Sequence, residues 1–307
     1  MAILTPRHRW LRDHGASAPG GTRSGNPMKA CAPQAGTPGS AIRMAVVVPL
    51  ANESDTINSF LDRVLAQLGE ADRVFCVLDR VSKDDTRQKV EARAAADPRV
   101  VLVWAPENRC VVDAYFRGYR EALQAGAQWI LEMDGGLSHR PEEIARFIDA
   151  MGTGVDYAGG CRFMPGGSYS GPWSRYILSK GGTVLTNLLL GTTMRDMTSG
   201  FECFSRRAME AVLKHGVRSR AHFFQTEIRW LLHDWHRVEV PINYINPSKR
   251  VGTASIKESF ANLWALRREQ SLRQKRGGPR RSRSPEDVML GLDPPPADNP
   301  ARHRGQP

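Results

Sequence analysis

The 307-residue sequence has little cysteine and no long apolar run, and both absences limit what the protein can be. Its five cysteines are scattered, odd in number and nowhere spaced as Cys-x-x-Cys. This argues against a zinc site or a disulfide framework and favours a reducing compartment such as the cytosol. No stretch approaches the roughly 18–20 apolar residues that span a bilayer. The basic N-terminus lacks an apolar core, so we expect no signal peptide.

The formal net charge of +11 is concentrated at the two ends of the chain. Residues 1–40 contribute +4 and residues 267–307 contribute +5, which leaves about +2 for residues 41–266. A groove that binds nucleic acid needs its cations on the folded core rather than on tails. We therefore expect no nucleic-acid partner, and only the tails support that alternative.

Composition divides the chain into four segments. Residues 1–40 are rich in Gly, Pro, Ser, Thr and Ala, so we expect them to be disordered or, if translation begins at Met44, to precede the native protein. Residues 277–307 are rich in Arg, Ser and Pro and are also expected to be disordered. Between them we predict one catalytic domain over residues 41–256 and a basic amphipathic helix over residues 257–276.

From Met44 onward, apolar β-type runs alternate with segments of helical periodicity. This alternation is typical of β-α-β units and predicts an α/β fold, with a Rossmann-like, mostly parallel sheet and helices on both faces. The predicted strands are 44–50, 73–78, 100–103, 128–133, 157–160, 201–204 and 237–244. The main predicted helices are 86–96, 111–124, 173–190, 206–214, 225–234 and 256–275. One more helix is predicted after Asn52, which we expect to cap it.

Several polar residues follow predicted strands, and ligands bind at the carboxyl edge of an open parallel sheet. Asp134 ends the fourth strand and is a candidate metal ligand and catalytic residue, although an acid in a glycine turn often only stabilises that turn. Asp79 ends the second strand and could accept a hydrogen bond from a nucleotide base. Arg162 follows the strand 157–160, and its guanidinium can bind two phosphate oxygens at once. With Asp134, Arg162 and Arg175 are the candidate catalytic residues.

The first strand is followed by Pro49, Asn52 and Glu53, where a helix N-terminus would favour the phosphates of a nucleotide. A plain helix cap is the simpler alternative for these residues.

Two basic segments could bind further phosphate. Arg175 and Ser179 are four residues apart, so they share one face of the helix 173–190. Lys249 and Arg250 precede Gly252 in a predicted loop and could close over a diphosphate. For both segments, a solvated surface is the default interpretation.

Taken in order, these motifs resemble the family-2 glycosyltransferases, and within them the dolichyl/polyprenyl-phosphate mannose synthase group. The matching segments are Val48–Glu53, Val77–Thr86, Asp134–Pro141, Gly160–Gly167, Ser174–Ser179, Asp196–Phe201, Phe224–Glu227 and Glu239–Ile242. The resemblance implies a GT-A fold and an inverting transfer of sugar from GDP-mannose or a UDP-sugar to a polyprenyl or dolichyl phosphate. It also implies that the lipid phosphate lies beside Arg175 and Ser179. The phosphate oxygen is already an anion, so no strong general base is required.

The sequence departs from this group at three places. Gly136 stands where the metal-binding Asp-x-Asp motif has its second acid, so we expect use of Mg²⁺ or Mn²⁺ to be weakened. The base-binding loop has only Asp79 where two acids are common. Lys249 is the first residue of a closing loop that usually begins with arginine.

Two alternatives keep the same fold. In one, the acceptor is a soluble sugar or metabolite, and Glu202 or Glu227 supplies the base. In the other, the protein binds nucleotide-sugars without catalysis. A lipid acceptor would require contact with the inner face of the cytoplasmic membrane, for which the basic helix with Phe260 and Trp264 is the candidate. The alternative for this helix is that it simply packs on the core. The sequence does not indicate an oligomeric state.

Overall fold

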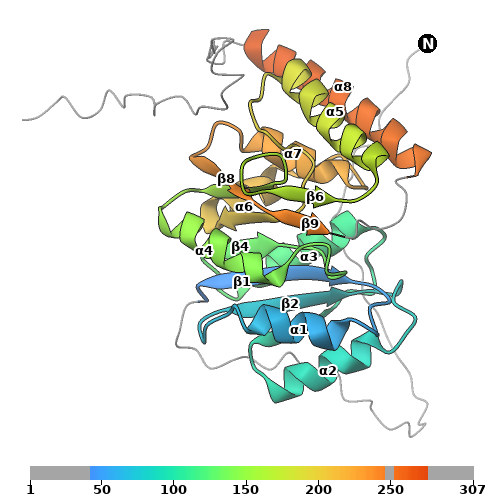
Figure 1. Ribbon diagram of the computed structural model, residues 1–307, viewed down its shortest axis with the longest axis vertical. Helices are drawn as coiled ribbons and strands as arrows, with labels where there is room; N and C mark the ends of the chain where they lie inside the picture. Colours follow the sequence, from blue (N-terminus) through green and yellow to red (C-terminus); the bar gives the residue numbers. More distant parts are fainter. Residues whose placement is uncertain (1–41, 246–251, 276–307) are drawn as a thin grey trace, which may run out of the picture. The chain divides into compact units, whose positions relative to one another are not determined.

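The computed structural model describes residues 42–245 and 252–275 (Figure 1). Its strands are β1 (Met44–Leu50), β2 (Arg73–Leu78), β3 (Val100–Trp104), β4 (Trp129–Glu132), β5 (Tyr157–Cys161), β6 (Ser168–Ser170), β7 (Glu202–Ser205), β8 (Arg237–Pro241) and β9 (Asn243–Ile245). Its helices are α1 (Ile57–Leu65), α2 (Thr86–Ala96), α3 (Val111–Gln124), the 3-10 helix η1 (Pro141–Glu143), α4 (Ile144–Gly152), α5 (Trp173–Leu190), α6 (Arg206–His215), α7 (Phe223–Leu231) and α8 (Thr253–Lys275). The two predicted tails lie outside the described residues.

The larger sheet contains seven strands in the order β3-β2-β1-β4-β7-β5-β8. Its neighbouring strands are parallel, except that β7 is antiparallel to both β4 and β5. β4 and β5 therefore run in the same direction as β1, so their carboxyl ends share one edge. The mostly parallel sheet predicted from the sequence is confirmed. β6 and β9 form a separate two-stranded parallel sheet.

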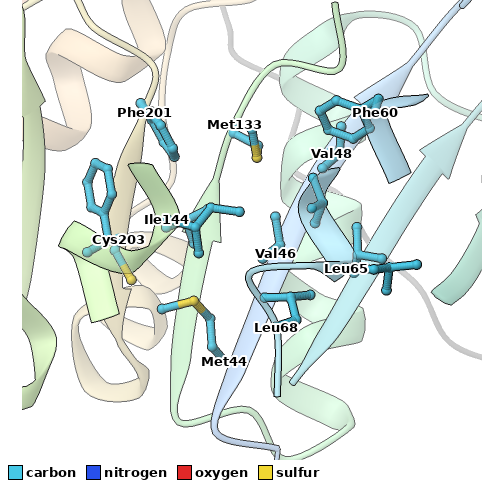
Figure 2. Close-up of a cluster of buried hydrophobic side chains, with 14 of the residues drawn as sticks. Met44, Val46, Val48, Phe60, Leu65, Leu68, Met133, Ile144, Phe201 and Cys203 are labelled. Carbon is cyan, nitrogen blue, oxygen red and sulfur yellow. The ribbon is translucent and has the colours of Figure 1, made fainter. Parts of the chain in front are cut away.

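Helices cover both faces of the larger sheet, and β1 shows how the sequence produces this arrangement. Met44, Val46 and Val48 pack with residues of α1 and α4, whereas Ala45 and Val47 pack with residues of α3. Successive side chains of a strand point to opposite faces, so a strand buried on both faces must be apolar throughout. Figure 2 shows the first of these clusters, with side chains of β1 and α1 among the sticks.

Gly118 allows α3 to pack closely on the sheet. A Cβ at this position would lie 2.3 Å from Val47 Cγ1 and 2.9 Å from Val77 Cγ2. Both distances are shorter than any normal carbon contact, so a larger residue would push α3 away from β1 and β2.

Three local predictions need correction. Asn52 does not cap α1: the N-cap is Thr56, and Asn52 itself has a φ of 56° in the preceding loop. The predicted strand 237–244 is two strands, β8 and β9, which pair with different sheets. β6 was not predicted, because three exposed or half-exposed residues carry no apolar alternation.

The C-terminal helix α8 packs against α5 and α7 (Figure 1). Leu263 and Leu266 are buried in a cluster with Leu190 of α5 and Phe223 of α7. By contrast, Phe260 and Trp264 are exposed. α8 therefore buries Leu263 and Leu266 against its neighbouring helices and leaves Phe260 and Trp264 exposed.

Candidate active site

Asp134 lies just beyond β4 at the carboxyl edge of the sheet. Its side chain is 42% exposed, and its Oδ1 accepts a hydrogen bond of 3.2 Å from the hydroxyl of Tyr115 on α3. Burial and the charge of Asp134 raise the pKa of Tyr115 well above its ordinary value, so this hydroxyl stays a donor. Tyr115 of α3 thus orients the carboxylate.

His139 is a buried, neutral imidazole beside Asp134. The backbone N–H of Asp134 donates to His139 Nδ1 at 3.1 Å, so the proton of the imidazole sits on Nε2. Burial lowers the pKa of His139, with a further contribution from the charge of Arg162 and an opposing one from Asp134. Among the described residues, Nε2 has no hydrogen-bond partner.

Arg162 follows β5 and is held by a carboxylate that the sequence analysis did not assign to it. Its Nε and Nη2 donate to the two oxygens of Asp196 at 2.7 and 2.8 Å, and Nη2 also donates to Thr198 Oγ1 at 2.6 Å. Burial alone would raise the pKa of Asp196, but the charge and hydrogen bonds of Arg162 hold it at about 2. The pair stays ionised at neutral pH, and the Nη1 group of Arg162 has no described hydrogen-bond partner.

A cavity of about 310 Å³ connects these residues to α5, α7 and α8. Its polar lining includes Asp134, His139, Arg162, Arg175 and Ser179. The structure therefore brings together both predicted phosphate-binding groups, one from the end of β5 and the other from α5. Tyr244 of β9 also lines this cavity and lies near Arg162, with 5.4 Å from the guanidinium carbon to the ring centroid.

The remaining wall of the cavity is apolar and comes mainly from the two packed helices. Its members are Leu178 and Leu185 of α5, Phe223 of α7, and Ile256, Phe260 and Leu263 of α8. One cavity thus offers cations and hydrogen-bond donors on one part of its lining and hydrocarbon on another.

Apart from Asp134, the described residues predicted to bind nucleotide do not line this cavity. Asp79 is half-buried directly after β2 and accepts a hydrogen bond from the Val81 backbone at 2.8 Å. Asn52 joins the loops after β1 and β2, because its Oδ1 accepts from the Lys83 backbone at 2.8 Å. Lys249 and Arg250 lie outside the described residues. Asp134 alone, of the described residues predicted to bind nucleotide, also lines the cavity.

Glu202 and Glu227 are unsuited to act as the base for a soluble acceptor. Glu202 is fully buried and accepts a hydrogen bond of 2.7 Å from Arg229 Nε. The carboxylate of Glu227 accepts the backbone N–H groups of Arg218 and Ser219 at 2.7 and 2.9 Å. Neither lines the cavity, so each carboxylate stabilises the fold through its hydrogen bonds and does not face an acceptor.

A larger groove of about 770 Å³ lies between α3 and α6. Two of its arginines pair with acids: Arg117 with Glu107 and Glu121, and Arg220 with Asp113. Because these charges neutralise one another at the surface, the groove offers a ligand little that water does not.

Sequence reasoning missed three groups of this site. Asp196 lay in a recognised motif but received no role, because its partner Arg162 is 34 residues away. His139 lay inside the Asp134–Pro141 motif and also received no role. Tyr115 and Tyr244 gave no signal, since each looks like an ordinary core aromatic until the fold places it.

The family of the chain follows from comparison with known proteins. Residues 45–213, which run from β1 into α6 and include most of the site, match the family model described as Glycosyl transferase family 2. The chain belongs to this family. It is therefore a glycosyltransferase, as the sequence motifs indicated.

Curated relatives cover most of the folded region. The chain is 31% identical to the polyprenol monophosphomannose synthase of Mycolicibacterium smegmatis, over 73% of this chain and 88% of the relative. It is 29% identical to the undecaprenyl-phosphate mannosyltransferase of Micrococcus luteus, over 66% of this chain and 84% of the relative.

Solved structures confirm the GT-A fold. Glucosyl-3-phosphoglycerate synthase from Mycobacterium tuberculosis, in complex with UDP, has a TM-score of 0.55 at 19% identity, covering 76% of this chain and 86% of that one. The same enzyme with Mn²⁺, UDP and phosphoglyceric acid has a TM-score of 0.53 at 17% identity, covering 80% and 86%. At such low identity the likeness concerns the fold alone.

Proposed function

We propose that this glycosyltransferase moves a sugar from a nucleotide-diphosphate sugar, GDP-mannose or a UDP-sugar, to a polyprenyl phosphate. The observation that carries the proposal is the divided lining of the cavity. An acceptor with an anionic head and a hydrocarbon tail matches cations on one part of the lining and apolar helices on the other. The two curated relatives are named as enzymes of polyprenyl-type phosphates, which supports the same acceptor class here.

The donor nucleotide is proposed to bind at the carboxyl edge of the sheet. Asp79, Asp134 and Arg162 follow β2, β4 and β5, whose ends share that edge. Asp79 would accept from the base, with Pro49, Asn52 and Glu53 in the neighbouring loop. Lys249 and Arg250 would close over the diphosphate. Isothermal titration with GDP and UDP tests this part, and we expect saturable binding of at least one of them.

On the acceptor side, we propose that Arg175 and Ser179 hold the lipid phosphate. Of the described residues lining the cavity, Asp134 is the one carboxylate. A soluble alcohol would need a base to remove its proton, whereas a phosphate oxygen is already an anion. The scarcity of carboxylates therefore favours the lipid phosphate over a soluble acceptor.

A divalent cation, Mg²⁺ or Mn²⁺, is proposed to assist the departure of the diphosphate. In the described part of the chain, no three His, Cys, Asp or Glu side chains gather where one ion could bind. Asp134 therefore fits an ion held largely by substrate phosphates, as is usual for Mg²⁺ in such enzymes. When bound, the ion would neutralise charge that develops on the leaving group.

The protein is proposed to contact the inner face of the membrane through α5 and α8. Trp173 and Leu188 of α5 are 70% and 75% exposed, and Trp264 of α8 is 59% exposed. Exposed apolar side chains that gather on neighbouring helices are typical of membrane-binding surfaces. No helix in the described ranges is long and apolar enough to span a bilayer.

The proposal is tested by mixing purified protein, labelled GDP- and UDP-sugars and polyprenyl phosphate in detergent, with a divalent cation present. We expect label from one donor to enter the organic phase. If label instead appears only on soluble phosphorylated or sugar acceptors, the acceptor class is wrong. Nucleotide binding without transfer to any acceptor would indicate the non-catalytic alternative.

A further inference from the structure

We propose that Glu53 supplies the second carboxylate for the divalent cation, in place of the acid that Gly136 lacks. The inference rests on the proposed function, because the ion is expected together with the nucleotide donor. It gives Glu53 a role as a metal ligand rather than as part of a nucleotide-binding loop.

The first observation is the position of Glu53 relative to Gly136. A Cβ built on Gly136 would lie 3.5 Å from Glu53 Oε1. A carboxyl group attached to that Cβ would therefore reach the space beside the Glu53 carboxylate. Gly136 lies two residues after Asp134, so the loop after β1 brings an acid to the place where the Asp-x-Asp motif would have its own.

The second observation is that Glu53 is fixed in place yet keeps one oxygen available. Thr56 Oγ1 donates to Glu53 Oε2 at 2.8 Å, and the Glu53 backbone N–H donates to Thr86 Oγ1 at 2.9 Å. Among the described residues, none hydrogen-bonds to Oε1, and no Lys or Arg forms an ion pair with Glu53. A half-buried carboxylate without a cation, next to the Asp134 loop, is stabilised when a cation binds between them.

A third observation indicates that a ligand with acceptor oxygens completes this place. His139 is 1% exposed, lies beside Asp134 and lines the cavity. Its Nε2–H has no described acceptor, and a buried donor left unpaired is costly. A phosphate oxygen bound with the ion would satisfy it. Mg²⁺ is usually bound in this way, by one or two carboxylates together with substrate phosphates.

The test measures Mn²⁺ binding by calorimetry in the full-length protein, with saturating GDP or UDP, whichever binds. Glu53→Gln removes the charge but keeps an acceptor for Thr56. Losing a hydrogen-bond partner that only orients a metal ligand typically weakens metal binding roughly 10–100-fold. Losing the ligand itself should cost at least as much, so we expect the Mn²⁺ affinity of Glu53→Gln to fall by that factor. Asp55→Asn, an equal charge change at an exposed residue of the same loop, is the matched control and should bind Mn²⁺ like the wild type.

Two further variants keep the result independent of folding and of net charge. Glu53→Asp retains the charge but withdraws the carboxylate by one methylene, and it should also weaken Mn²⁺ binding. Gly136→Asp in the Glu53→Gln background should restore most of the affinity, because Gly136 does not have positive φ and can accept a side chain. Thermal unfolding of each variant checks the fold.

The outcomes separate this inference from the proposed function. If GDP or UDP binds and Glu53→Gln takes up Mn²⁺ as tightly as the wild type, Glu53 is not a ligand, while the proposed function stands. If Asp55→Asn weakens Mn²⁺ binding as much as Glu53→Gln does, the effect is general charge and the inference also fails. If neither nucleotide binds to the wild type, both the inference and the proposed function are overturned.

Discussion

Arg162 and Asp196 form a buried ion pair whose members are joined by two hydrogen bonds, at 2.7 and 2.8 Å. Burying two charges is costly, and the cost is met only while both partners are present. The pair also fixes the Arg162 side chain at the cavity. Stability, and the function that we propose, thus depend on the same guanidinium.

Asp196→Asn should destabilise the protein strongly, because it leaves Arg162 buried without a counter-charge. We expect the free energy of unfolding to fall by about 3–5 kcal/mol, measured by urea denaturation. The control is Glu91→Gln, which breaks the exposed Arg87–Glu91 pair on α2 and should cost about 0.5 kcal/mol or less. Similar losses of unfolding free energy in the two variants would show that the buried pair stabilises the protein no more than an exposed pair does.

Arg175→Ala should affect the acceptor rather than the donor. Removing a charge-assisted contact to the lipid phosphate should cost roughly 1.5–3 kcal/mol in kcat/KM for the lipid. Nucleotide affinity should change little, and Arg120→Ala, an exposed arginine on α3, should change neither. An equal loss of nucleotide affinity in Arg175→Ala would assign this arginine to the donor site instead.

At the scale of elements, β4 and β7 place two buried carboxyl groups opposite each other. Glu132 and Glu202 are register partners in this antiparallel pair. Burial raises the pKa of Glu202 to about 7, although Arg229 opposes the shift. Burial and the charge of Glu202 raise the pKa of Glu132 well above its ordinary value. Tyr119 and Gln225 donate hydrogen bonds to Glu132.

This pair predicts how stability depends on pH. The folded protein keeps these protons at a pH where the unfolded chain, with a Glu pKa near 4.5, has lost them. The free energy of unfolding should therefore fall as the pH rises from about 4.5 to about 7. Glu132→Gln should flatten this decline in urea unfolding at several pH values, whereas exposed Glu91→Gln should keep it. An unchanged slope in Glu132→Gln would contradict the assignment.

The exposed faces of α5 and α8 form the second element-scale prediction. Trp173→Ser combined with Leu188→Ser should weaken co-sedimentation with anionic phospholipid vesicles by at least tenfold, because burying each side chain is worth roughly 1.5–3 kcal/mol. Both residues are exposed, so the fold should be unaffected. Val81→Ser, at an exposed apolar residue in the loop after β2, is the control. Vesicle binding that is equal in all three proteins would exclude this surface as the contact.

Elements with strong periodicity could be predicted from the sequence, and those defined by tertiary contacts could not. The bounds of β1, α2, α3 and α5 match the predicted ranges, because buried strands and amphipathic helices leave a clear apolar pattern. β6 has no such pattern and exists through its pairing with β9. The two apolar sides of α8 were also hidden, since sequence alone does not say which side packs on α5.

The same division applies to the candidate site. Residues at strand ends, such as Asp79 and Asp134, could be predicted because topology sets which edge they share. The partnership of Arg162 with Asp196 and the closeness of Glu53 to Gly136 could not, because each joins segments that are far apart in the chain. No local pattern encodes such a distance.

At the scale of the whole molecule, the sheet edge where we propose that the nucleotide binds and the cavity with an apolar wall meet at Asp134. The first half of the chain supplies β1, β2 and β4, with the candidate donor residues. The second half supplies α5, α7 and α8, which make most of the cavity wall. Membership in the glycosyl transferase family 2 gives the reaction class, and the cavity gives the acceptor class that we propose.

The most direct test of this account compares three acceptors with one nucleotide-sugar donor: polyprenyl phosphate, the polyprenol without phosphate, and a water-soluble short-chain phosphate. If the cavity binds both head and tail, kcat/KM should be highest for polyprenyl phosphate. It should be at least tenfold lower for each of the other two. The polyprenol lacks the phosphate and the short-chain phosphate lacks the long tail, and each loss should cost roughly 1.4 kcal/mol or more. Equal use of the soluble phosphate and the lipid would contradict the role of the apolar wall, and with it the central claim.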